Sequence, residues 1–222
     1  MYSYLAVQRD GAARSSTMSD ETPVVFIVDD DVSVRESLEL LICSVGWRPE
    51  TFASAKAFLE RSRSLVANCL ILDVNLPDLS GLDLQKLISV DRTDMPIIFI
   101  TGYGDVPMTV KAMKAGAAEF LTKPFNDEEL LGAIKLALER SKTALALDSE
   151  LHVLRDRYVS LSRREQEVMT LVVRGLLNKQ VGFELGISEI TVKAHRGQAM
   201  RKMQARSLAE LVNMAARLRI TE

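Results

Sequence analysis

The chain contains few of the features that mark a secreted or membrane-embedded protein. Cysteine occurs only twice in 222 residues, as Cys43 and Cys69, and both lie in apolar segments, which predicts reduced core residues. No apolar run approaches the roughly 20 residues that cross a bilayer. The start of the chain shows no basic segment followed by an apolar stretch, as a signal peptide would. These absences favour a cytoplasmic protein that does not contact a membrane.

A strong charge of one sign is also absent, but the two parts of the chain differ. The formal net charge is −2, and the length leaves room for two modest domains. Residues 23–140 carry 18 acidic and 12 basic side chains, whereas residues 141–222 carry 9 acidic and 14 basic ones. The difference predicts a metal or phosphate site in the first part and a polyanionic partner for the second, although a solvated surface explains either half alone.

The first 140 residues predict a leader followed by one α/β domain. Residues 1–22 are small, polar and unpatterned, so we expect a disordered leader. Short apolar runs then alternate with helical patterns, which predicts a doubly wound, five-stranded parallel sheet with helices on both faces. The strands are expected at 24–28, 48–52, 69–73, 96–101 and 118–122, and the helices at 32–45, 54–64, 82–90, 106–115 and 127–140.

Three carboxylates follow directly on the first apolar run. The run 24–28 suits a strand buried on both faces of a parallel sheet, and Asp29, Asp30 and Asp31 come where that strand ends. Crowded carboxylates repel one another unless protons or a cation neutralise them. A hard cation such as Mg²⁺ (or Mn²⁺) prefers oxygen ligands of this kind. The alternative is an acidic loop that caps the next helix.

Polar residues also end three later strands of the predicted sheet, namely Asp73, Thr101 and Lys123. The carboxyl ends of parallel strands share one edge, where α/β sheets place ligand sites. A nucleophilic carboxylate, a cation, a hydroxyl and an ammonium group together suit phosphoryl transfer to an aspartate. Each of these residues alone is more often a cap or a turn residue, so the prediction depends on their common edge.

The order and spacing of these residues resemble the receiver domain of two-component response regulators over residues 23–140. The resemblance implies a CheY-like, flavodoxin-like domain in which Asp73 accepts a phosphoryl group from a sensor histidine kinase. It implies metal ligation by Asp29 (through water), Asp30, Asp73 and the backbone carbonyl of Asn75. It further implies phosphoryl contacts from Thr101 and Lys123, a cis peptide before Pro124, and a switch formed by Thr101 and Phe120.

The segment that begins Thr101-Gly102-Tyr103-Gly104-Asp105 resembles the FixJ-like subgroup more narrowly. The resemblance implies that the following helix and the fifth strand form a dimer face when the domain is phosphorylated, with Val106 and Met113 in that face. A homodimer is therefore expected on phosphorylation.

Residues 141–160 are predicted to form a helical linker. Apolar residues recur there at spacings of 3 and 4, which is typical of a heptad seam. The seam comprises Ala144, Leu147, Leu151, Leu154, Tyr158 and Leu161. Two interpretations stay open, namely pairing with a second copy of the chain, or a single amphipathic helix packed on its own domains.

Residues 161–222 are helical in pattern throughout. Ser162 and Glu165 have the spacing of a capping box at the start of the first helix. A short helix at 178–185, a turn with glycine and a longer helix capped by Ser188 predict a helix-turn-helix. The fold expected for the whole chain is therefore an α/β receiver, a linker helix and an all-α four-helix domain.

The longer helix of this domain is rich in basic residues. Such a helix can lie in the major groove and neutralise phosphates, although a solvated basic face is the commoner explanation for one isolated helix. The segment resembles the LuxR/NarL-type DNA-binding domain, in which the positions of Lys193, Ala194 and Gly197 face base edges. His195 is either a phosphate contact or a buried polar group. The expected DNA-contacting residues are Thr191, Lys193, Ala194, His195, Arg196, Gly197, Arg201 and Lys202.

Together these features predict a response regulator that acts as a transcription factor and catalyses only its own phosphorylation and dephosphorylation. The expected partners are a sensor histidine kinase, promoter half-sites in DNA, a second copy of the chain and RNA polymerase. Two other classes remain as alternatives. One is a phosphatase that uses Asp73 as nucleophile, although Asn75 stands where such enzymes place a second acid. The other is a DNA-binding protein whose receiver has lost its function.

Overall fold

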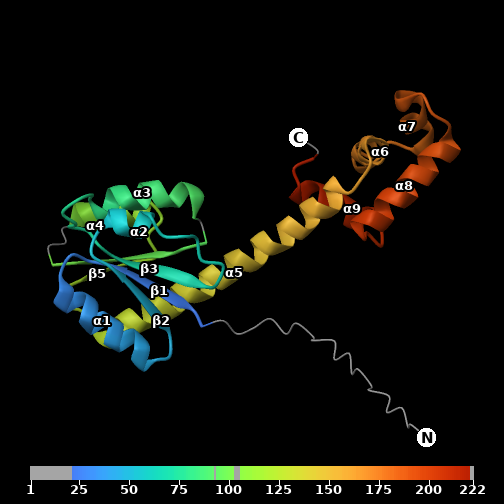
Figure 1. Ribbon diagram of the computed structural model, residues 1–222. Helices are drawn as coiled ribbons and strands as arrows, with labels where there is room; N and C mark the ends of the chain where they lie inside the picture. Colours follow the sequence, from blue (N-terminus) through green and yellow to red (C-terminus); the bar gives the residue numbers. More distant parts are fainter. Residues whose placement is uncertain (1–21, 93, 103–105, 221–222) are drawn as a thin grey trace, which may run out of the picture.

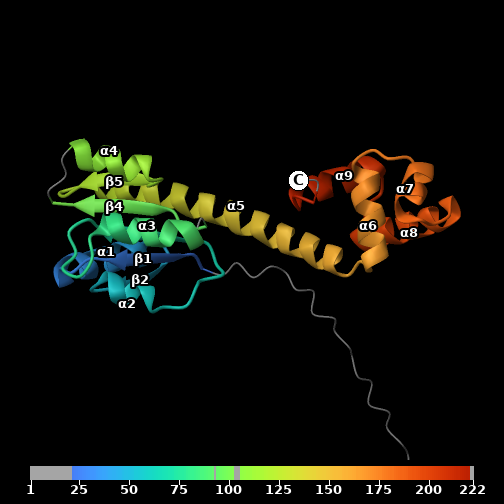
Figure 2. The ribbon, with the colours of Figure 1, turned by 90° about the horizontal axis from the view of Figure 1, so that it is seen from above.

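The computed structural model describes residues 22–92, 94–102 and 106–220. In these ranges the first strands and helices form one end of the molecule, and the last four helices form the other (Figure 1). One long helix joins the two ends, which stand apart in both views (Figure 2). No helix in the described ranges is both long enough and apolar enough to cross a membrane.

The apolar runs form the sheet that the sequence predicts. The strands are β1 (Val24–Val28), β2 (Arg48–Phe52), β3 (Asn68–Asp73), β4 (Ile97–Thr101) and β5 (Glu119–Thr122). They lie in the order β2-β1-β3-β4-β5, and every neighbouring pair is parallel. The five expected strands are confirmed to within one residue at each end. Every residue of β1, β3 and β4 is buried, because helices cover both faces.

Two groups of helices cover the two faces of the sheet (Figure 1). Alternate residues of the central strands pack against one group or the other. Phe26 and Leu70 point toward one group, whereas Ile27 and Ile71 point toward the other. The first group consists of α2 (Ala55–Leu59), α3 (Gly81–Asp91) and α4 (Val106–Lys114), and the second of α1 (Val32–Ser44) and the first part of α5 (Asp127–Val159).

The helix expected over 54–64 is shorter in the structure, because α2 ends at Leu59. After it, the Arg61 guanidinium lies over the Phe26 ring, 3.6 Å from the centroid, and its Nε donates to Glu50 at 3.3 Å. Tertiary contacts of Arg61 therefore prevail over the local helical pattern.

The prediction that Cys43 is a core residue is wrong, because its side chain is exposed on α1. The buried residues Leu38 and Ile42 lie four positions apart on one side of this helix, and Cys43 is about 100° further round. Cys69, in contrast, is fully buried in β3, and this burial raises the pKa of its thiol.

The linker continues α5 without interruption, so that one helix of 33 residues, roughly 50 Å long, connects the domains. The Ser141 hydroxyl accepts a hydrogen bond from the Asn68 N–H at 3.0 Å where α5 leaves the sheet. The seam residues Leu154, Tyr158 and Leu161 pack in the core of the C-terminal domain. This half of the seam therefore packs on its own domain.

The C-terminal domain contains α6 (Arg163–Val173), α7 (Asn178–Leu185), α8 (Glu189–Met203) and α9 (Leu208–Arg217). The predicted capping box is confirmed, since the Ser162 and Glu165 side chains each bond the other's backbone N–H. Ser188 caps α8 as expected, and Gly186 takes the left-handed conformation (φ 66°) in the turn before it. Val192, Ala199 and Met203 are fully buried and form the inner face of α8.

Candidate functional site

Three carboxylates meet at the carboxyl edge of the sheet. Asp29 and Asp30 follow β1, and Asp73 ends the neighbouring strand β3. One oxygen of each carboxylate lies within 4.8 Å of the other two. Asp29 is fully buried and Asp73 is 8% exposed, whereas Asp30 is exposed, so the cluster opens to solvent through Asp30. Asp31 instead caps α1 by accepting a hydrogen bond from the Ser33 N–H.

Lys123, just beyond the end of β5, brings a positive charge to the cluster. Its Nζ lies 2.7 Å from Asp29 Oδ2 and 3.8 Å from Asp73 Oδ2. The Lys123–Pro124 peptide is cis, as the resemblance implied. Arg35, which the sequence gave no reason to single out, donates from Nη1 to the backbone carbonyl of Asp29 at 2.6 Å. These contacts fix the loop that carries the two acids after β1.

Asp73 is an unusual carboxylate in this cluster. Burial raises its pKa above the ordinary value, the Asp29 charge adds to this effect, and Lys123 and the backbone N–H groups of Asn75 and Val74 oppose it. Its Oδ1 is buried and has no hydrogen-bond partner among the described residues. An unsatisfied buried oxygen is costly, and a set of carboxylate oxygens suits a hard divalent cation. The residues present therefore fit such an ion.

Thr101 lies on β4, the strand next to that of Asp73, and Phe120 lies on β5, one strand further along the sheet. Thr101 ends β4, is fully buried, and its backbone carbonyl accepts a hydrogen bond from the Lys123 N–H at 2.8 Å. Phe120 is half-buried in β5, and its ring centroid is 6.1 Å from that of Phe99. The structure thus places Asp73, Thr101 and Lys123 at the ends of three adjacent strands. Tyr103, Gly104 and Asp105 of the FixJ-like segment lie outside the described residues.

The backbone at Asp73 and Val74 is in close contact with Gly81. Gly81, the first residue of α3, donates its N–H to the Val74 carbonyl at 2.9 Å. A Cβ atom at this position would lie only 2.4 Å from the Asp73 carbonyl oxygen and 3.0 Å from Val74 Cα. Sequence reasoning missed Gly81 because the contact is tertiary, and Ser80-Gly81 signals only the start of a helix.

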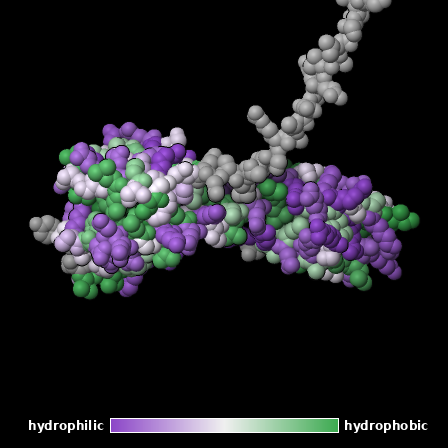
Figure 3. Space-filling model, turned by 90° about the horizontal axis from the view of Figure 1, so that it is seen from below, coloured by the Kyte–Doolittle hydropathy of each residue, from purple (hydrophilic) through white to green (hydrophobic). Residues whose placement is uncertain are grey.

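The predicted DNA-contacting residues of α8 differ in their exposure. Five of them are exposed, namely Lys193, Ala194, Gly197, Arg201 and Lys202, whereas Thr191, His195 and Arg196 are half-buried. Four of the polar side chains already have partners within the domain. The Thr191 hydroxyl lies 2.8 Å from the Ser188 hydroxyl, and Lys193 pairs with Glu189 at 3.0 Å. Arg196 bonds Asn178 at 3.3 Å, and Lys202 pairs with Glu165 at 2.6 Å. On the face in Figure 3, hydrophilic residues (purple) predominate over this domain.

Comparison with known proteins matches both parts of the chain to families. Residues 25–135 match the response regulator receiver domain, and residues 159–215 match the bacterial regulatory proteins of the luxR family. This chain is a response regulator. Its α/β part is the receiver, and the four helices after the linker form a LuxR-type DNA-binding domain, as the sequence predicted.

Relatives of this response regulator align over nearly its whole length. Nodulation protein W of Bradyrhizobium diazoefficiens is 49% identical over 92% of this chain and 90% of its own. The transcriptional regulatory protein FixJ of Rhizobium meliloti is 42% identical over 89% of this chain and 96% of its own. The low-resolution structure of the response regulator StyR is 47% identical, superposes with a TM-score of 0.76, and covers 88% of this chain and 98% of its own. The expected FixJ/NarL-type membership is confirmed.

Proposed function

We propose that this response regulator is phosphorylated on Asp73 by a sensor histidine kinase, and that phosphorylation promotes dimerisation and DNA binding. The observation that carries the proposal is Asp73 itself. It is a buried carboxylate with one unsatisfied oxygen, within reach of Lys123 and beside two further acids. A carboxylate oxygen of Asp73 can attack a phosphoryl group that approaches from the exposed, Asp30 side of the cluster.

In this reaction the phosphorus–nitrogen bond of a phosphohistidine breaks, the imidazole leaves with the bonding electrons, and a bond forms between phosphorus and a carboxylate oxygen of Asp73. Asp29, Asp30, Asp73 and the Asn75 carbonyl would hold Mg²⁺ (or Mn²⁺), which when bound shields the charge between carboxylate and phosphoryl group. Lys123 would move from Asp29 to a phosphoryl oxygen, and the Thr101 hydroxyl would bind another. The chain catalyses only its own phosphorylation and dephosphorylation, so we propose no external substrate.

A groove beside the acid cluster is suited to the kinase. It has a volume of about 370 Å³ and lies between α1 and the segment that joins β5 to α5. Leu38, Leu41 and Phe125 supply apolar surface, and Lys123 and Asp127 stand at its polar side. A helix of the kinase that docks in this groove would bring its phosphohistidine next to Asp73.

The output of phosphorylation is proposed to pass through α4. Movement of Thr101 toward the phosphoryl group would let Phe120 turn inward and shift the neighbouring helix. The face of α4 presents Val106, Val110 and Met113 with exposures of 76%, 44% and 42%, which suits a dimer contact. Two DNA-binding domains joined in a dimer bind far more tightly than one. We place this regulator in the cytoplasm, with promoter DNA and RNA polymerase as partners.

The test is footprinting across genomic DNA with and without acetyl phosphate and Mg²⁺. The proposal predicts footprints that strengthen with the phosphodonor in the wild type and do not respond to it in Asp73→Ala. Equal binding by both proteins under both conditions would instead support a DNA-binding protein that does not depend on phosphorylation.

A further inference from the structure

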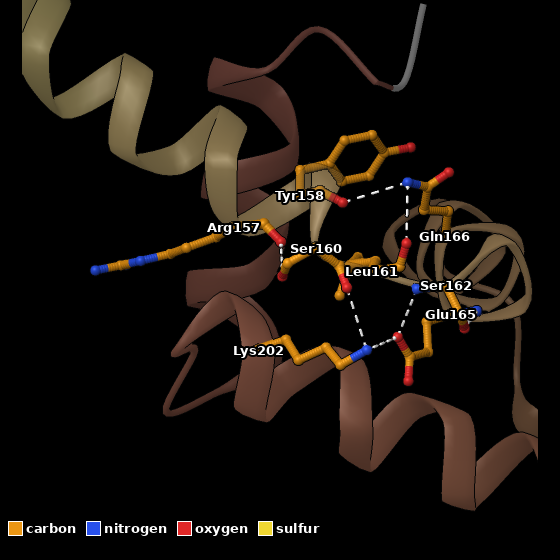
Figure 4. A network of polar contacts seen from close by, with 8 residues as sticks. All are labelled: Arg157, Tyr158, Ser160, Leu161, Ser162, Glu165, Gln166 and Lys202. Atoms are coloured by element: carbon orange, nitrogen blue, oxygen red, sulfur yellow. Dashed lines mark hydrogen bonds and ion pairs between the residues drawn. The ribbon is translucent and has the colours of Figure 1, made fainter.

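The second helix of the helix-turn-helix, α8, is called the recognition helix below. The linker helix α5 and this recognition helix cap each other's C-terminal ends. Lys202, in the last turn of α8, places its Nζ 3.2 Å from the carbonyl oxygen of Ser160, the capping residue of α5 (Figure 4). In return, Arg157 of α5 donates from Nη1 to the carbonyl oxygen of Met203, the last residue of α8, at 3.4 Å. Terminal carbonyls of a helix lack intrahelical donors and carry partial negative charge, so each cation meets a favourable acceptor.

The Lys202 side chain is 38% exposed, but its ammonium makes a second contact, with a buried carboxylate. Its Nζ also lies 2.6 Å from Glu165 Oε2, and the same oxygen accepts the Ser162 N–H at 2.7 Å (Figure 4). Glu165 is only 6% exposed, and the bond from Lys202 is the largest cause that lowers its pKa. If Lys202 turned away toward DNA, a buried carboxylate would lose its cation. The Lys202 ammonium therefore joins α5, α6 and α8 at one point.

Apolar contacts occupy the space between these polar ones. Leu154 and Leu161, from α5 and the residue after its cap, share a core cluster with Ala199 and Met203 of α8. Gln166 of α6 donates to two further carbonyls at this junction, those of Tyr158 and Leu161. The junction thus combines packing with directional bonds, which leaves little freedom for α8 to turn about the end of α5.

We propose that Lys202 and Arg157 are positioning residues that lock the linker helix and the recognition helix into one rigid unit. The direction in which α5 leaves the receiver would then set the direction of α8, and so the distance between the two recognition helices of a dimer. The inference deepens the proposed function and rests on it. It replaces the prediction that Lys202 contacts DNA, because this ammonium acts through α8 rather than on a phosphate.

The experiment uses the full-length protein, acetyl phosphate with Mg²⁺, and a DNA duplex selected by the wild type from a randomised pool. Affinity is measured by fluorescence anisotropy at several salt concentrations, on this duplex and on one with half a helical turn inserted between the half-sites. The test variant is Arg157→Gln/Lys202→Gln, and the matched control is Arg201→Gln, which removes an exposed arginine from the same turn of α8.

The insertion should weaken wild-type binding about 100-fold, because only one half-site can then be engaged. It should weaken the double variant by less than about tenfold, with an unchanged slope of log affinity against log salt, because no phosphate contact is lost. The control should lose as much affinity on insertion as the wild type does. Its slope of log affinity against log salt should decrease in magnitude by about 0.9 if Arg201 contacts a phosphate. Arg157→Lys/Lys202→Arg keeps both cations and should behave as the wild type.

Two results would overturn the inference: a wild-type response to spacing in the double variant, or a salt slope reduced as for one lost phosphate contact. Thermal unfolding shows whether the double variant folds, and if it does not, Arg157→Gln alone, which leaves the Lys202–Glu165 pair intact, must still relax the response to spacing. Failure of the wild type to select any duplex would contradict the proposed function itself, and the coupling with it.

Discussion

Replacement of Gly81 by alanine tests whether the backbone behind Asp73 must be closely packed. The added Cβ would lie 2.4 Å from the Asp73 carbonyl oxygen, 3.0 Å from Val74 Cα and 3.2 Å from the Asp73 carbonyl carbon. All three atoms belong to the backbone, so no side chain can move aside. Either the loop after β3 or the start of α3 must shift by about 1 Å to restore an ordinary contact.

The size of the effect on stability follows from the clash of the added Cβ and from the hydrogen bond that the shift breaks. Overpacking of this kind costs about 1–3 kcal/mol, and loss of the hydrogen bond from the Gly81 N–H to the Val74 carbonyl as the backbone shifts adds about 1 kcal/mol. Gly81→Ala should therefore lower the free energy of unfolding by about 2–4 kcal/mol. Because a misplacement of about 1 Å in a reacting group can cost roughly 100-fold in rate, phosphorylation of Asp73 should slow by a similar factor.

Urea unfolding and the rate of phosphorylation by acetyl phosphate measure these two effects. Gly132→Ala in α5 is the matched control, because a Cβ there meets nothing within 4 Å and alanine favours a helix by up to about 1 kcal/mol. The control should be as stable as the wild type or more so, with an unchanged rate. If Gly81→Ala had the stability and the phosphorylation rate of the wild type, the claim that the contact with Gly81 fixes the loop after β3 would be refuted.

Three further predictions concern the DNA-binding domain. The pKa of Glu165 in the folded protein is below its ordinary value of 4.5. Ionised Glu165 therefore stabilises the fold above that pH, and this contribution disappears as the pH falls. Thermal unfolding of Glu165→Gln should accordingly depend less on pH below about 4.5 than thermal unfolding of the wild type does. Gly182→Ala should destabilise the domain by about 1–3 kcal/mol in urea unfolding, since its Cβ would lie 2.8 Å from the Ile187 carbonyl oxygen, and an unchanged midpoint would contradict the contact. Lys193→Ala should weaken DNA binding and reduce the salt slope by about 0.9, and an equal slope would show that Lys193 does not neutralise a phosphate.

The sequence was informative wherever local chemistry decides the structure. Runs such as Val24–Val28 are short, β-branched and apolar on both faces, which favours central strands of a covered sheet. Ser162 and Glu165 indicate a helix start by their spacing. The candidate site was predictable for the same reason, since Asp73, Thr101 and Lys123 end or directly follow strands that a parallel sheet aligns at one edge.

The remaining features depend on contacts between distant segments. The early end of α2 follows from Arg61 stacking on Phe26, and the need for glycine at 81 follows from the Asp73 carbonyl, neither of which a sequence pattern reveals. The contacts of Lys202 in the C-terminal domain could not be predicted from the sequence for the same reason. As part of a basic helix it suggests a phosphate contact, but the fold places Glu165 and the Ser160 carbonyl beside it.

The most direct test of the account is the intact mass of the protein after treatment with acetyl phosphate and Mg²⁺. The account predicts the addition of one phosphoryl group, which is absent without the divalent cation and absent in Asp73→Asn. An unmodified wild type, or a phosphoryl group that Asp73→Asn still acquires, would contradict the assignment of Asp73 as the phosphoacceptor.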